Sequence, residues 1–82
     1  MPKFFMFLGY WIGRFSQEED RAHVHVVKFG SHETMKVWLE PDIEIESIHG
    51  INAATANKII AEIRSRKDEC LNKWRECERK GR

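Results

Sequence analysis

The chain has 82 residues, of which 41% are hydrophobic and 33% charged, and its formal net charge is +1 at pH 7. These fractions are typical of a folded globular protein and exclude a disordered tail. A chain of this length has a small core, so residues 1–82 are predicted to form one domain to which a partner or a second copy adds stability.

The longest apolar stretch covers residues 4–12 and is interrupted by Gly9. It is too short to cross a bilayer, and no small-residue cleavage pattern follows it. We therefore interpret it as a core strand and expect a cytoplasmic protein that does not enter the membrane.

The first half of the chain, residues 1–49, has the alternation and the turn residues of β-strands. The expected strands are, in chain order, residues 4–15, 22–29, 32–39 and 43–48. The first of these forms either one long bent strand or a hairpin that turns near Gly9. Gly30-Ser31 is typical of a two-residue turn, and residues 40–42 make a three-residue turn.

The turn at Gly30-Ser31 predicts a register for the two strands that it joins. The expected pairs are His23 with Trp38, Val24 with Val37, His25 with Lys36, Val26 with Met35, Val27 with Thr34, Lys28 with Glu33, and Phe29 with His32. One face is then continuously apolar, which supports the register because a slip by one residue would scramble it. The next turn extends the pattern by setting Ile45 across from Val37, Glu44 across from Trp38, and Glu46 across from Lys36.

His23 and His25 are the most informative residues, because residues two apart in a strand project from the same face. Imidazoles titrate near neutral pH, and acid–base chemistry needs one histidine with a cation and a carboxylate in reach. Lys36 and Glu46 complete such a set, so the catalytic candidates are His23, His25, Lys36 and Glu46. The alternative is a solvated polar sheet face on which Lys36 and Glu46 form an ordinary ion pair.

Two further chemical interpretations concern metals and binding. The histidines lack a third ligand at a recognised spacing, so we expect no metal and no cofactor. Arg14 is a candidate for contact with phosphate, Trp38 for stacking on a base, and Trp74 for anchoring a protein interface. Each aromatic residue has a packing alternative, in which it covers an edge of the core.

The second half of the chain, residues 52–80, is predicted to be one long helix with Asn52 as its N-cap. Its apolar stripe lapses at residues 65–67, where the helix kinks, breaks or leaves the sheet. About 28 helical residues span roughly 42 Å, more than this sheet needs for cover. The late part of the helix is therefore expected to dock on a protein partner or a second copy of the chain.

Charge and cysteine content also bear on the helix. Residues 1–63 contain six Lys or Arg and nine Asp or Glu, a balance of −3, whereas residues 64–82 contain eight and four, a balance of +4. The basic end suits nucleic acid or an acidic partner, or it is a solvated helix end. Cys70 and Cys77 are separated by a rise of about 10 Å on a helix, too far for a disulfide.

Several segments resemble a small bacterial family catalogued as domain of unknown function 4160. The segments that carry the resemblance are residues 1–13 (MPKFFMFLGYWIG), the acidic residues 18–20, residues 23–26 (HVHV), residues 34–39 (TMKVWL) and residues 72–74 (NKW). Arg21 and Ala22 stand where members of the family usually have one or two prolines, a departure that concerns the rigidity of the entry loop and not the strand.

The resemblance implies a functional context but no reaction. Family members are often encoded beside another small protein, in an arrangement similar to a toxin–antitoxin pair, so it implies a toxin-like component bound by a cognate partner, with RNA as a further ligand of the histidine face. The alternatives are a non-enzymatic binding or dimerisation module, antitoxin-like or structural, and a metal-binding protein. The residues leave open whether the chain is an enzyme.

The expected fold is of the α+β class. It is a small antiparallel sheet of three to four strands, with a long C-terminal helix packed on its apolar face.

Overall fold

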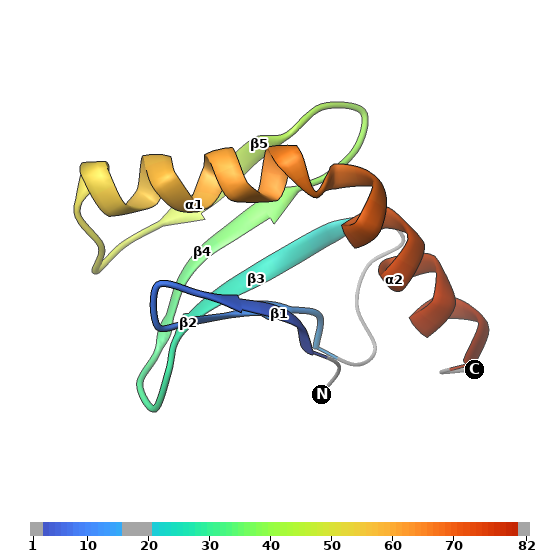
Figure 1. Cartoon of the computed structure of the whole chain (residues 1–82), viewed down its shortest axis with the longest axis horizontal. Coiled ribbons are helices and arrows are strands. Elements are labelled where there is room, and N and C mark those ends of the chain that lie inside the picture. Colours follow the sequence, from blue (N-terminus) through green and yellow to red (C-terminus); the bar gives the residue numbers. More distant parts are fainter. Residues whose placement is uncertain (1–2, 16–20, 81–82) are drawn as a thin grey trace.

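The computed structural model describes residues 3–15 and 21–80, which form an antiparallel sheet followed by two helices (Figure 1). The acidic segment 18–20 of the predicted loop lies outside the described residues. The elements are β1 (Lys3–Phe7), β2 (Tyr10–Gly13), β3 (His23–Lys28), β4 (Glu33–Trp38), β5 (Glu44–Ile48), α1 (Ala53–Ser65) and α2 (Lys67–Lys80). The strands are adjacent in the order β1-β2-β3-β4-β5, so each strand pairs with its neighbour in sequence.

The α+β class and the antiparallel sheet with a helical C-terminal half are confirmed, but the number of elements differs from the prediction. The sheet has five strands in the described residues, not three or four, because the first apolar segment forms a hairpin. Leu8 and Gly9 make its turn with φ angles of 53° and 80°. Two consecutive positive φ angles are the mark of a type I′ turn, whose twist matches that of the flanking strands.

Two helices, not one, follow the sheet. Asn52 caps α1 as predicted, because its side-chain oxygen accepts a hydrogen bond of 2.8 Å from the backbone N–H of Thr55. The helix ends at Arg66, where the φ and ψ angles are −110° and 23°. This break falls within the lapse of the apolar stripe, and α2 leaves the line of α1 beyond it (Figure 1).

Both helices contribute to one core over the apolar face of the sheet. The buried helix residues are Ala56, Ile59 and Ile63 of α1 and Cys70, Leu71 and Trp74 of α2. They belong to the same cluster as Ile12, Val24, Val26, Met35, Val37 and Leu39 of the sheet and its connections. The chain changes direction at the break between α1 and α2, and this change lets the apolar residues of α2 reach the core. A continuous straight helix would carry them away from the sheet.

The register between β3 and β4 agrees with the prediction except near the turn. The pairs from His23 with Trp38 to Val26 with Met35 are as expected, but Val27 pairs with Glu33 and not with Thr34. Phe29, Gly30 and Ser31 form a three-residue loop, because Lys28 donates its N–H to the carbonyl of His32. The predicted two-residue turn was therefore wrong. A β-bulge at Thr34 absorbs the difference, and the rest of the ladder keeps its register.

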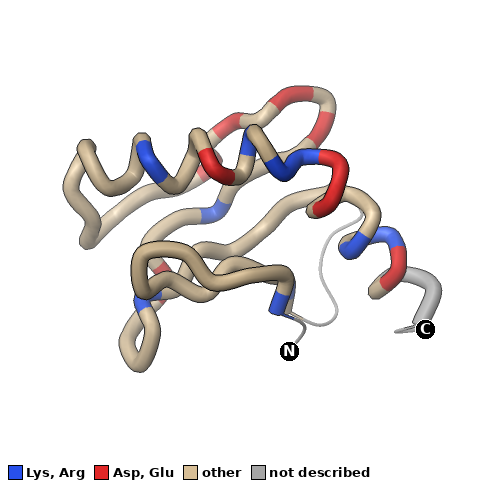
Figure 2. Tube along the Cα trace, viewed as in Figure 1, with Lys and Arg blue, Asp and Glu red and all other residues tan. Residues whose placement is uncertain are grey.

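A second bulge lies between β4 and β5. Val37 faces Ile45 and Trp38 faces Glu44, as predicted, but Lys36 faces Ser47 and Met35 faces Ile48. Glu46 is the extra residue, so the prediction that it lies across from Lys36 was wrong. Bulges and charged side chains are common on edge strands because they prevent pairing with other chains. Acidic residues gather along β5 and the loop before it (Figure 2).

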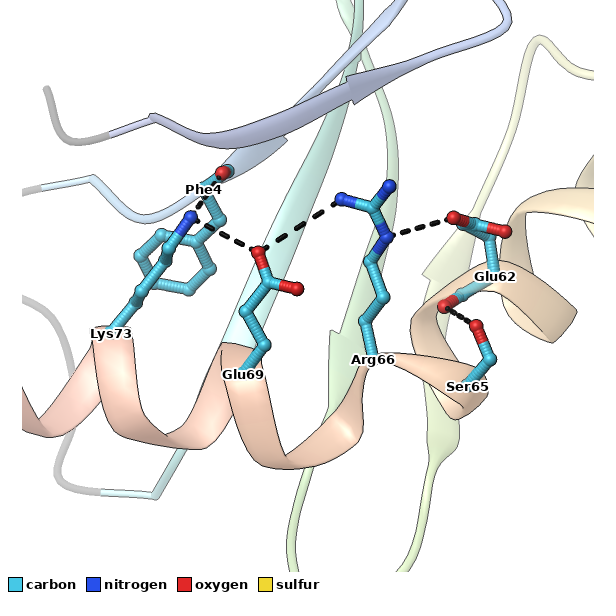
Figure 3. Close-up of polar contacts among 6 residues, drawn as sticks. All are labelled: Phe4, Glu62, Ser65, Arg66, Glu69 and Lys73. Atoms are coloured by element: carbon cyan, nitrogen blue, oxygen red, sulfur yellow. Dashed lines mark hydrogen bonds and ion pairs between the residues drawn. The ribbon is translucent and has the colours of Figure 1, made fainter.

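Polar contacts attach α2 to the first strand (Figure 3). Arg66 bridges Glu62 and Glu69, and Lys73 bridges Glu69 and the backbone carbonyl of Phe4, to which it donates a hydrogen bond of 2.7 Å. Lys73 thereby holds the helix against β1. None of the helices in the described residues is long and apolar enough to span a membrane.

Candidate functional site

His23 lies inside the protein and not on a solvated face, since its exposed fraction is 0%. Its Nδ1 donates a hydrogen bond of 2.6 Å to the carbonyl of Arg21. A carbonyl can only accept, so Nδ1 carries the proton. The ring meets Trp38 edge-on at a centroid distance of 5.5 Å and lies 6.3 Å from the ring of Trp74. His23 is therefore held in one orientation by its surroundings.

His25 is held just as firmly, by a carboxylate that the sequence did not indicate. Its Nδ1 is hydrogen-bonded to Oε2 of Glu33, and its side chain is 7% exposed. Phe15 stacks on the imidazole with a centroid distance of 4.0 Å and an interplanar angle of 12°. Gly13 faces His25 on β2 and has no side chain, which leaves space beside the imidazole for this aromatic cover.

An open pocket of about 390 Å³ adjoins this pair on the face of the sheet that carries the histidines. This aromatic pocket is lined by Trp11, Phe15, Val27, Phe29, Gly30, Ser31 and Glu33. Trp11 and Phe15 form one wall, with their rings stacked at 5.9 Å, and Phe29 stands at the rim with an exposed fraction of 72%. The volume lies at the lower end of the range that ligand sites occupy.

The other end of the same face is built around Trp38. Its ring lies 4.2 Å from the guanidinium carbon of Arg21 and 4.7 Å from the Nζ of Lys36. Arg21 also forms an ion pair of 3.4 Å with Glu44 on β5. These cation–π contacts occupy the ring of Trp38 within the chain. They account for its position without a stacked base, and the predicted role in binding stays a prediction.

The predicted catalytic residues are brought together only in part. Lys36 faces His25 in the ladder as expected, but its amine lies over Trp38 and its partner on β5 is Ser47. Glu46 is exposed on the edge strand. Glu33 is the carboxylate that contacts His25, and sequence reasoning missed it because the two-residue turn placed it on the opposite face.

Arg14 and Trp74, two of the predicted binding residues, lie together in the interior, each with an exposed fraction of 6%. The guanidinium carbon of Arg14 is 4.4 Å from the ring centroid of Trp74, and its Nη1 donates a hydrogen bond of 3.1 Å to the Trp74 carbonyl. This placement corresponds to the packing alternative for Trp74. The roles in phosphate contact and interface anchoring remain untested predictions.

Within the described residues, no three His, Cys, Asp or Glu side chains gather closely enough to hold a metal ion. The exposed pair His32 and His49 stacks at a centroid distance of 6.1 Å, but no carboxylate or thiol of residues 3–15 and 21–80 joins it to make such a group. The Glu33 carboxylate contacts His25 and the Arg21 carbonyl contacts His23, and each contact orients its imidazole.

Comparison with known proteins gives a family. The model of the family described as "Domain of unknown function (DUF4160)" matches residues 9–75, which is most of the chain. The chain belongs to this family. The match includes the histidine strand, Glu33 and all the described residues that line the aromatic pocket. No curated protein and no solved structure matches the chain.

Proposed function

We propose that this member of the DUF4160 family is a non-enzymatic binding module, one component of a toxin–antitoxin-like pair, which holds its protein partner at the aromatic pocket. The observation that carries the proposal is the pocket itself, which is open, mostly apolar and rimmed by Phe29 at 72% exposure. Exposed aromatic side chains around a concave site are the usual anchors of protein interfaces.

The pocket supports this role better than the late helix does. In α2, Trp74 is buried in the core, Lys73 bonds to β1, and Arg75 forms an ion pair of 3.1 Å with Glu40 of the same chain. These side chains already have partners within the chain. Truncation after Lys67 would remove Cys70, Leu71 and Trp74 from the core, so its effect on binding would be confounded by unfolding.

A sharper experiment changes only the rim of the pocket. The tagged chain is coexpressed with the product of the adjacent reading frame, and the purified sample is analysed by size-exclusion chromatography with light scattering. We expect a complex of the two proteins, and we expect Phe29→Ala to weaken it at least tenfold by removing the exposed aromatic ring at the rim. Leu8→Ala is the matched control, because Leu8 is 54% exposed at the neighbouring hairpin turn and does not line the pocket.

Two outcomes would count against the proposal. If Phe29→Ala binds as tightly as the unaltered chain, the partner docks elsewhere. If the two proteins form no complex at all, the assignment to a toxin–antitoxin-like pair fails. In that case, a molar mass by light scattering that is a multiple of the mass of this chain would indicate a homo-oligomer.

A second candidate function, a toxin that acts on RNA by acid–base chemistry, is favoured by one observation. Glu33 holds Nδ1 of His25, and a carboxylate in this position orients an imidazole for proton transfer at Nε2. Phe15 would have to move from the face of the imidazole before a substrate could approach, since the His25 side chain is 7% exposed.

This candidate is tested by growth arrest on expression of the chain alone. A catalytic His25 predicts that arrest is lost in His25→Gln and reduced in Glu33→Gln, with the folded state verified by circular dichroism. Full arrest in His25→Gln would exclude it. His23→Ala does not serve as a test, because loss of this fully buried ring would destabilise the fold.

A further inference from the structure

We propose that the aromatic pocket receives the cationic side chain of a lysine or arginine from the protein partner. This inference rests on the proposed function, since it names the chemical group by which that partner is recognised. It follows from two properties of the lining residues, their aromatic faces and their charge.

The aromatic walls suit a cation with an aliphatic stem. Trp11, Phe15 and Phe29 all line the pocket. The rings of Trp11 and Phe15 lie 5.9 Å apart with an angle of 24° between their planes, and Phe15 also covers His25 at a centroid distance of 4.0 Å. The face of an aromatic ring carries partial negative charge and attracts ammonium or guanidinium groups within about 6 Å. The methylene groups of a lysine or arginine side chain bury against the same surface.

The charge of the pocket selects the sign of its ligand. Glu33 is the one charged residue among the described residues that line it. Its Oε2 is bonded to Nδ1 of His25, whereas Oε1 makes no hydrogen bond within the described part of the chain. The Glu33 side chain is 35% exposed, so this oxygen is accessible to a donor that enters the pocket. A charge-assisted hydrogen bond to a cation is the strongest contact that such an oxygen can make.

The same charge disfavours a nucleic acid at this position. A stacked base would find aromatic surface here, but its phosphate would approach the carboxylate of Glu33 with no cation among the described lining residues to balance it. Arg14 lies instead against Trp74, and Lys36 lies over Trp38. The electrostatics of the pocket therefore point to a basic side chain of a protein.

The test uses the isolated full-length chain and small probes, so it requires no partner. The ¹⁵N-labelled protein is titrated with n-butylammonium and n-butylguanidinium, which mimic the two side chains. Neutral n-pentanol and anionic uridine monophosphate are titrated for comparison. We expect both cations to shift the Trp11 indole signal and the amide signals of Gly30 and Ser31. Their dissociation constants should be at least fivefold below that of n-pentanol and should rise with added salt.

Two substitutions separate charge from shape. Glu33→Gln keeps an oxygen that accepts the hydrogen bond of His25, so the fold is retained while the negative charge is lost. We expect it to weaken binding of both cations about tenfold and to leave n-pentanol binding unchanged. Glu44→Gln is the matched control, because Glu44 lies on the edge strand and pairs with Arg21 outside the pocket. It should bind the cations as the unaltered chain does.

Four results would overturn the inference. The first is equal affinity for n-pentanol and the cations, and the second is unchanged cation binding in Glu33→Gln. The third is that uridine monophosphate binds more tightly than the cations, as reported by the same signals. The fourth is a shift of those signals when the protein alone is concentrated, which would mean that a second copy occupies the pocket. Each is measured without the adjacent gene product, so failure of this inference is distinguishable from failure of complex formation.

Discussion

His25 and Glu33 are hydrogen-bonded through Nδ1 and Oε2, although the residue that faces His25 in the β3–β4 ladder is Lys36. The contact exists because Val27 pairs with Glu33, which places this carboxylate on the face that carries the histidine. Thr34, the bulged residue between Glu33 and Met35, makes that pairing possible. The lining of the aromatic pocket therefore depends on one extra residue in β4.

The first prediction concerns this bulge. Thr34 is fully buried, and its hydroxyl donates a hydrogen bond of 2.9 Å to the Val26 carbonyl. Thr34→Val keeps the shape but removes the donor, so we expect the free energy of unfolding to fall by about 1–2 kcal/mol in urea titrations. Thr34→Ser retains the hydroxyl and should lose less. Equal losses in the two variants would show that the methyl group contributes as much as the hydrogen bond, and a larger loss in Thr34→Ser would contradict this account.

The attachment of α2 to β1 gives a second prediction. Lys73 donates to the Phe4 carbonyl at 2.7 Å and is the end of the chain of ion pairs in Figure 3. Lys73→Met removes this hydrogen bond, and we expect a loss of about 1 kcal/mol in the free energy of unfolding, because exposed ion pairs alone contribute little. Lys58→Met, an exposed position on α1, is the control and should change stability by less than about 0.5 kcal/mol. Similar losses in both variants would refute the role of Lys73.

Leu8 adopts a conformation that suits a different residue. Its φ angle is 53° in the first hairpin turn, and its side chain is 54% exposed. Residues with a Cβ pay a steric cost in this region, but asparagine tolerates it. Leu8→Asn is therefore expected to raise the free energy of unfolding by about 0.5–1 kcal/mol, measured by thermal and urea denaturation. Leu8→Ala keeps the steric cost of a Cβ at positive φ, so it should not raise the free energy of unfolding. An increase as large as that in Leu8→Asn would contradict this account.

A fourth prediction concerns alkaline pH. Burial raises the pKa of the Cys70 thiol from 9.0 to about 11, with a smaller contribution from the negative charge of Glu69. Above pH 9 the unfolded chain releases this proton before the folded protein does, so the free energy of unfolding falls as the pH rises from 9 to about 11.

The measurement compares urea titrations of the unaltered chain and Cys70→Ala at pH 8 and pH 10.5. The loss of stability between the two pH values should be smaller in the variant, which has no thiol to ionise at this position. Equal losses would assign the alkaline instability to other groups, the lysines in particular.

Much of the sheet was predictable, because alternation and turn residues depend on near neighbours. The pairing of Val24 with Val37 and of Val26 with Met35 was correct, since a slip by one residue would have exposed the apolar face. Asn52 was identified as an N-cap by its residue type and its place before an apolar stripe. These features depend on residues that lie close together in the chain, so residue types and spacing were enough to predict them.

The aromatic pocket and the carboxylate in its lining could not be predicted, because they form only when the strands and the connections between them come together in the fold. A bulge leaves the residue types of its strand unchanged, so nothing in the sequence distinguished Glu33 from Glu46 as the neighbour of a histidine. The same is true of His23, which was expected on a sheet face, and of Trp74, for which the sequence left packing and interface anchoring open. Both side chains lie in the interior. The burial of both side chains depends on the break at Arg66, because this break directs α2 toward the core. Contacts between residues 50 or more positions apart require the completed fold.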